Sequence, residues 1–146
     1  MTNPTKPTTQ QTLQQQRAKS AWEDTGQVKT NEQSEYKSLV RGFAAQIQRD
    51  GLGASLVFLK AKGKSHHLQL EAHVNAWVLT QLDPKASNPK EFEAILAKNK
   101  KDKGADLLKW LLNKDSNTYR RAAAEAIAYL MWLKRFVEAW KDTKNG

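Results

Sequence analysis

The 146-residue chain contains no cysteine, which excludes disulfide scaffolds, cysteine nucleophiles and thiolate metal sites. Apolar β-branched residues are also scarce, with six valines and three isoleucines compared with 18 alanines and 16 leucines. Because alanine and leucine favour helices whereas β-branched residues favour strands, the composition predicts an all-α fold. The chain also lacks any run approaching the roughly 20 apolar residues of a membrane span, and its polar start lacks the apolar segment of a secretion signal. We therefore expect a cytoplasmic protein with no membrane partner.

Acidic residues are too few to balance the basic ones: there are 15 Asp and Glu and 24 Lys and Arg, so the formal net charge is +9. Basic residues exceed acidic ones by 7 to 5 in residues 1–50, 9 to 5 in residues 51–104 and 8 to 5 in residues 105–146. No single tail therefore carries the excess. A folded surface of this charge suits a polyanion such as the phosphate backbone of a nucleic acid. For the lysine-rich residues 98–103, plain solubility is an equally good explanation.

The spacing of apolar residues predicts six or seven helices and no strand, packed into a compact irregular bundle. Residues 1–10 have too few apolar side chains to order themselves and are expected to form a flexible tail. Residues 11–146 are expected to form a single helical domain. One segment shows the helical pattern clearly, because its apolar residues fall at i, i+3, i+4, i+7, i+8 and i+11. These residues are Tyr36, Leu39, Val40, Phe43, Ala44 and Ile47.

Further helices are predicted from their ends or their composition. The first runs over residues 12–26. A short helix over residues 54–62 is apolar on nearly every side, which predicts a position at the centre of the core. Ser65 and Asn88 are expected to cap two more helices. The last helix, over about residues 116–142, is expected to be the longest.

Two patterns that can bind a metal ion or a phosphate are present only in part. His67 and Glu71 have the i, i+4 spacing of two ligands on one helix, but no HExxH pattern or third ligand accompanies them. We expect the three histidines, His66, His67 and His73, to be exposed polar residues. The glycines at residues 51–53 follow no strand, so we interpret them as a helix stop and restart rather than a phosphate-binding turn.

Carboxylates lack the convergence that a metal-dependent nuclease needs. The pairs Glu23-Asp24 and Glu91/Glu93 are sequence neighbours without an evident third partner, and we expect them on solvated helix faces. No spacing unites serine, histidine and carboxylate residues into a catalytic group. We therefore predict no catalytic residue, no bound metal or cofactor, no small-molecule substrate and no enzyme activity.

The last helix divides into two sides when its residues are placed at 100° intervals. Arg121, Ala128 and Arg135 lie at heptad spacing opposite the apolar side, with Trp132 beside them. An arginine stripe next to an indole suits a nucleic-acid strand held by phosphate contact and stacking, and it equally suits a protein interface. The third explanation is that Trp132 belongs to the core beneath another helix. The predicted inward side comprises Ala123, Ala126, Ile127, Leu130, Leu133, Phe136, Val137 and Trp140.

Four short motifs follow one another in the order and spacing of a known family. They are TLQQQRA at residues 12–18, EYKSLVR at residues 35–41, DGLG leading to LVFL at residues 50–59, and EAIAYLMWLKRF at residues 125–136. In these motifs the chain resembles the small all-helical subunit of the Cmr complex, the type III-B CRISPR RNA-guided effector. The resemblance extends over about residues 12–140.

The resemblance implies a non-catalytic structural subunit of an antiviral complex. In such complexes several copies of the subunit stack into the shorter of two helical filaments, beside RAMP-fold subunits that carry the guide RNA. Together they shape the basic channel in which target RNA pairs, while other subunits cleave the target and synthesise cyclic oligonucleotides. The implied partners are therefore other Cmr and RAMP subunits, further copies of the chain, guide RNA and target RNA.

Three positions depart from the family pattern. Met131 stands where the family often has Asn, Asp50 stands where Asn is usual, and Ala44 stands where proline is common. The change at Met131 is expected to alter a buried hydrogen bond or a subunit contact. The other two changes concern helix geometry.

Several basic residues lie within the matching motifs and are candidates for contact with RNA or a neighbouring subunit. The alternative function is a free-standing, sequence-independent nucleic-acid-binding helical domain, which would have an intact core but no affinity for RAMP subunits. A third, weaker alternative is an enzyme with an unrecognised site. The candidate contact residues are Arg17, Arg41, Arg121, Trp132, Lys134 and Arg135.

Overall fold

The computed structural model describes residues 11–84 and 106–140, which form six α-helices and one 3₁₀ turn and contain no strand. This confirms the predicted all-α fold. None of these helices is both long enough and apolar enough to cross a membrane. The elements are α2 (Leu13–Gly26), a 3₁₀ turn (Thr30–Glu32), α3 (Gln33–Asp50), α4 (Leu52–Lys62), α5 (Ser65–Leu82), α7 (Leu107–Leu111) and α8 (Ser116–Glu138).

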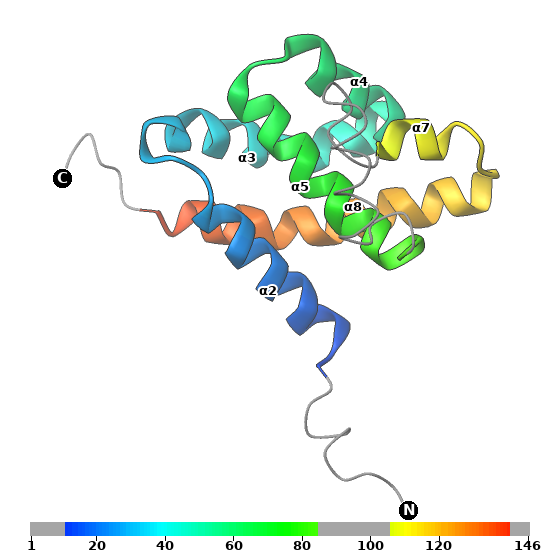
Figure 1. Ribbon diagram of the computed structural model, residues 1–146, viewed down its shortest axis with the longest axis horizontal. Helices are drawn as coiled ribbons and strands as arrows, with labels where there is room; N and C mark the ends of the chain where they lie inside the picture. Colours follow the sequence, from blue (N-terminus) through cyan, green and yellow to red (C-terminus); the bar gives the residue numbers. More distant parts are fainter. Residues whose placement is uncertain (1–10, 85–105, 141–146) are drawn as a thin grey trace, which may run out of the picture.

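The long helix α8 runs along one side of the bundle and organises it (Figure 1). It packs against α2, α3 and α5, while α3, α4 and α5 also pack against one another. The helix α2 crosses α8, and α7 lies near the N-terminal end of α8 (Figure 1). The surface of α8 that the other described helices leave open carries the candidate functional site.

The face of α3 that the apolar spacing predicted is the face that the structure buries. Tyr36, Val40, Phe43 and Ile47 are all at most 3% exposed. Full burial of one large apolar side chain contributes about 1.5–3 kcal/mol, so this face anchors α3 in the bundle.

The short helix α4 is less buried than its composition suggested. Leu52, Leu56 and Leu59 are fully buried, but Val57 is 49% exposed. The helix packs on its neighbours with one side only, and the other side faces solvent. The prediction of a central α4 is therefore wrong, because an apolar composition does not specify how many sides of a helix find partners.

Two glycines shape the turn between α3 and α4. Gly51 has a φ of 94°, a conformation that favours glycine. The backbone N–H of Gly53 donates to the Tyr119 hydroxyl over 2.6 Å, and a Cβ at Gly53 would lie 3.1 Å from that oxygen. The predicted helix stop and restart is confirmed, and the close approach also connects the start of α4 to the start of α8.

Side-chain caps begin some helices but not all of those predicted. Thr12 and Gln15 form a reciprocal capping box at the start of α2, and Asp115 caps the start of α8. The predicted cap at Ser65 is wrong, because α5 begins at Ser65 itself and Lys64 precedes it without a side-chain cap.

The buried side of α8 contains the predicted inward residues, four of them only partly buried, and also includes Ala122 and Tyr129. Leu130 and Leu133 are buried as expected, and Tyr129 is fully buried as well. Ile127 packs against the core but is only partly buried. Because α2, α3 and α5 all pack on α8, their positions decide which of its residues are covered. The helix also ends earlier than predicted, at Glu138.

Four expectations lie outside the described residues. They are the flexible tail at residues 1–10, the helix that Asn88 was expected to cap, the solvated position of Glu91 and Glu93, and the lysine-rich residues 98–103.

Candidate nucleic-acid and subunit interface

One side of α8 is open to solvent for about four turns and is strongly basic. It carries four exposed cations together with an exposed alanine and an exposed methionine. We call this surface the α8 strip. It comprises Arg120, Arg121, Ala124, Met131, Lys134 and Arg135.

The two carboxylates of α8 are engaged by arginines from other helices. Glu125 pairs with Arg17 of α2, and Glu138 pairs with Arg41 of α3. Among the described residues, no carboxylate lies within ion-pair distance of the four cations of the α8 strip. The positive charge of the strip is therefore available to a partner.

Asp115, which precedes α8, interacts with the strip only at longer range. Its pKa lies below the ordinary value mainly because the Thr118 N–H donates to its carboxylate. Arg120 and Arg121 add a smaller electrostatic effect in the same direction.

The ion pair of Arg17 with Glu125 is partly buried and has two hydrogen bonds. Arg17 Nε donates to Glu125 Oε2 over 2.6 Å, and Nη2 donates to Oε1 over 2.8 Å. Trp77 of α5 donates its Nε1–H to Oε2 over 2.8 Å. Burial would raise the pKa of Glu125, but the hydrogen bonds from Arg17 and Trp77 outweigh it, so this pKa lies below its ordinary value. One carboxylate thus connects α2, α5 and α8.

The substitution Glu125→Gln should lower the free energy of unfolding by about 1–2 kcal/mol, because a charge-assisted bidentate contact becomes a neutral hydrogen bond. Thermal and urea denaturation of the purified chain will measure this loss. Glu138→Gln is the matched control on the same helix, since its carboxylate is paired at the exposed surface and exposed ion pairs contribute little. Equal losses in the two variants would contradict the special role of Glu125.

The second arginine pair lies at the surface between α3 and α8. Arg41 Nε and Nη2 donate to the two Glu138 oxygens over 2.6 and 2.8 Å, and the two side chains are 51% and 39% exposed. The hydrogen bond from Arg41 lowers the pKa of Glu138, and the positive charges of Arg41, Lys37 and Lys134 lower it further. Lys37 and Lys134 therefore act on this carboxylate only at longer range, beside its ion pair with Arg41.

Trp132 lies where α2 meets α8. Its Nε1–H donates to Gln14 Oε1 over 3.1 Å, and the ring is partly buried against the core. The Arg135 guanidinium lies 4.6 Å from the ring centroid. The helix α2 therefore covers one edge of the indole, and the cation–π contact holds Arg135 at the surface of the strip.

Met131 lies in the middle of the α8 strip and is 44% exposed. The expectation that this departure from the family pattern alters a buried hydrogen bond is therefore wrong for the chain itself. Its exposed position is compatible with the other expectation, a subunit contact.

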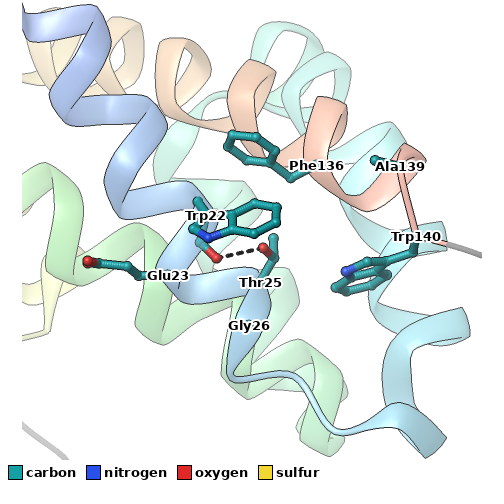
Figure 2. A pocket seen from close by; sticks show the side chains of 7 residues that line it. All are labelled: Trp22, Glu23, Thr25, Gly26, Phe136, Ala139 and Trp140. Carbon is teal, nitrogen blue, oxygen red and sulfur yellow. Dashed lines mark hydrogen bonds between the residues drawn. The ribbon is translucent and has the colours of Figure 1, made fainter.

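A hollow of about 320 Å³ lies where the C-terminal ends of α2 and α8 meet. Trp22, Phe136 and Trp140 surround it, and Glu23, Thr25, Gly26 and Ala139 complete its lining (Figure 2). The sequence analysis did not predict it, because its rings come from segments more than 100 residues apart in the chain.

The structure also buries polar groups that were expected at the surface. The Tyr36 hydroxyl lies 2.7 Å from His73 Nδ1, and the Tyr129 hydroxyl donates to Asp24. Burial lowers the pKa of His73 to about 4 and raises that of Asp24 to about 6, although the hydrogen bond from Tyr129 partly opposes the latter shift. The predictions that His73 and the Asp24 carboxylate are solvated are therefore wrong.

His67 is buried as well, at 7% exposure. Burial lowers its pKa, and the charges of His66, Lys62 and Lys64 act in the same direction. Its helical neighbour Glu71 pairs with Lys60. In residues 11–84 and 106–140 no group of three or more His, Cys, Asp or Glu side chains is arranged to hold a metal ion.

Comparison with models of known protein families matches residues 13–140 to the family described as CRISPR-associated protein (Cas_Cmr5). The match covers all of the described helices. No curated protein sequence matches the chain.

Proposed function

Because the chain belongs to the Cas_Cmr5 family of CRISPR-associated proteins, we propose that it is a non-catalytic structural subunit of a type III-B RNA-guided effector. In this proposal, further copies of the chain stack into the minor filament beside the RAMP-fold subunits, which carry the guide RNA. The assembly acts in the cytoplasm in antiviral defence and takes target RNA into a basic channel. The family match over residues 13–140 is the observation that carries the proposal.

The α8 strip supports the part of the proposal that concerns RNA. Its four cations have no carboxylate partner among the described residues, and they extend along one helix face. Phosphate contacts by such dispersed cations give an affinity that depends on salt and hardly on sequence. We therefore assign the strip to the wall of the target-RNA channel.

The six candidate residues then divide into two roles. Arg17 and Arg41 engage Glu125 and Glu138, so we propose that they position α2 and α3 and contact partners only with their remaining surface. The residues proposed to contact RNA or a neighbouring subunit directly are Arg121, Lys134 and Arg135, with Trp132 supporting Arg135.

The double variant Arg121→Ala/Arg135→Ala should melt like the parent chain but bind RNA and assemble more weakly. Four phosphate contacts predict that log K for single-stranded RNA falls with log[salt] at a slope of about −3, and removal of two cations should reduce the slope to about −1.4. Fluorescence anisotropy with a labelled RNA at several salt concentrations measures the slope. Pull-down with the RAMP-fold subunits measures assembly.

The matched control is Lys62→Ala/Lys64→Ala, which removes the same charge at the turn between α4 and α5. Equal slopes for the two double variants would mean that the α8 strip is only a solvated face. If the chain binds RNA but none of the RAMP-fold subunits, the function is that of a free-standing nucleic-acid-binding domain. If the double variant unfolds, the two arginines belong to the fold.

A further inference from the structure

We propose that the hollow between Trp22 and Trp140 binds one nucleobase of a single-stranded RNA by stacking. This inference rests on the proposed function, because the RNA backbone would follow the α8 strip that leads to the hollow. It adds base contact to a surface otherwise described by phosphate contact alone.

The rings of the hollow are placed to receive a flat apolar group. Trp22 is 62% exposed although it is the largest kind of apolar side chain. The ring centroids of Trp22 and Phe136 lie 5.3 Å apart, and the angle between the two ring planes is 70°. The ring centroids of Trp140 and Tyr36 lie 6.1 Å apart. Figure 2 shows the Trp22 and Trp140 indoles on opposite sides of the same space. The volume of about 320 Å³ lies at the lower end of the range for small-ligand pockets.

The polar groups of the hollow do not compete for an occupant. The Thr25 hydroxyl donates to the Trp22 carbonyl over 2.9 Å, and the Glu23 carboxylate is turned away from the rings (Figure 2). An occupant is therefore held by ring contact rather than by hydrogen bonds. Base–aromatic stacking of this kind tolerates every base, because each has a flat π-face.

A row of side chains connects the hollow to the α8 strip. The ring centroids of Phe136 and Trp132 lie 6.0 Å apart. The Arg135 guanidinium, which belongs to the strip, lies 4.6 Å from the Trp132 ring centroid. Cations that have no carboxylate partner in the described part of the chain lie at one end, and stacking rings lie at the other, which matches a chain of phosphates and bases. This continuity favours RNA over an apolar protein side chain, which would gain nothing from the adjacent positive charge.

The test compares a labelled RNA oligonucleotide with an abasic oligonucleotide of the same length, both measured by fluorescence anisotropy with the full chain. Both have the same phosphates, so the difference between them reports base contact. We expect the parent chain to bind the intact RNA about tenfold more tightly than the abasic one. The variant Trp22→Ala should bind the two with nearly equal affinity.

Two further variants keep the test independent of folding. Ala139→Leu fills the hollow without removing a ring and should abolish the preference for intact RNA as Trp22→Ala does. Leu112→Ala removes another exposed apolar side chain, 75% exposed, and should leave the preference unchanged. All three positions are exposed, so melting temperatures close to that of the parent are expected.

If the parent chain binds intact and abasic RNA equally and both with a steep salt dependence, the base site is overturned and the phosphate contact stands. If neither RNA is bound, both the base site and the proposed RNA contact are overturned. If Trp22→Ala weakens only the pull-down of protein subunits, the hollow is a protein interface and the base site is overturned.

Discussion

Replacement of Leu133 by alanine should lower the free energy of unfolding by about 2–5 kcal/mol, because it removes a buried side chain and leaves a cavity. Leu133 is fully buried on α8, and this helix packs against α2, α3 and α5. A cavity at this position therefore reduces the contacts of several helices. Urea denaturation will measure the change, followed by the negative circular dichroism band of α-helices at about 222 nm.

Met131→Ala is the matched control, because it shortens a side chain of similar size two positions earlier on the same helix. Met131 is 44% exposed, and substitution at such a surface usually changes stability by no more than about 0.5 kcal/mol. The two variants therefore separate burial from helix propensity. A loss at Met131 as large as that at Leu133 would show that the α8 strip is covered in the free chain.

Replacement of Asp24 by asparagine should stabilise the chain at pH 7–8 by up to about 3 kcal/mol, which corresponds to a pKa displacement of about two units. Burial raises the pKa of Asp24 from 3.8 to about 6, with the Tyr129 hydrogen bond opposing the shift and the charge of Glu23 adding to it. A raised carboxyl pKa means that folding favours the protonated form. The contribution of protonated Asp24 to the free energy of unfolding is therefore fully present below about pH 4 and is lost as the pH rises through 6.

Asparagine is always neutral and has nearly the same shape, so the variant avoids the cost of burying a charge. The stability difference between Asp24→Asn and the parent should shrink as the pH falls from 7 and disappear near pH 4. Burial lowers the pKa of His73 to about 4, so the unfolded chain binds a proton at this residue more readily than the folded chain does. The free energy of unfolding therefore decreases as the pH falls from 6.5 to 4, equally in the variant and the parent. Urea denaturation at several pH values will separate the two effects. A variant less stable than the parent at pH 8 would show that the hydrogen bond from Tyr129 to the carboxylate outweighs the burial.

The amino-acid sequence was sufficient for features that depend on neighbours along the chain. Helical spacing predicted the buried face of α3, and Gly51 predicted the break before α4, because both follow from backbone geometry within a few residues. The four ordered motifs indicated the family that the comparison of residues 13–140 then showed.

Other features required contacts between residues far apart in the chain. Arg17 and Glu125 are separated by 108 positions, and Arg41 and Glu138 by 97. No periodicity connects such residues, so these arginines were indistinguishable from the cations of the α8 strip. Only the packing of α2 and α3 on α8 showed which arginines are paired.

The same reason explains the errors about burial. A helical pattern predicts which residues share a face, but solvent exposure depends on whether another helix covers that face. Val57 is exposed because none of the helices in residues 11–84 and 106–140 covers its side of α4, whereas His73 and Tyr129 are buried because helices pack over them. The sequence by itself therefore determined the helices, the basic charge and the family. The tertiary structure alone decided which arginines pair with the two carboxylates of α8 and that Trp22 and Trp140 line one hollow, because both depend on how separate helices pack.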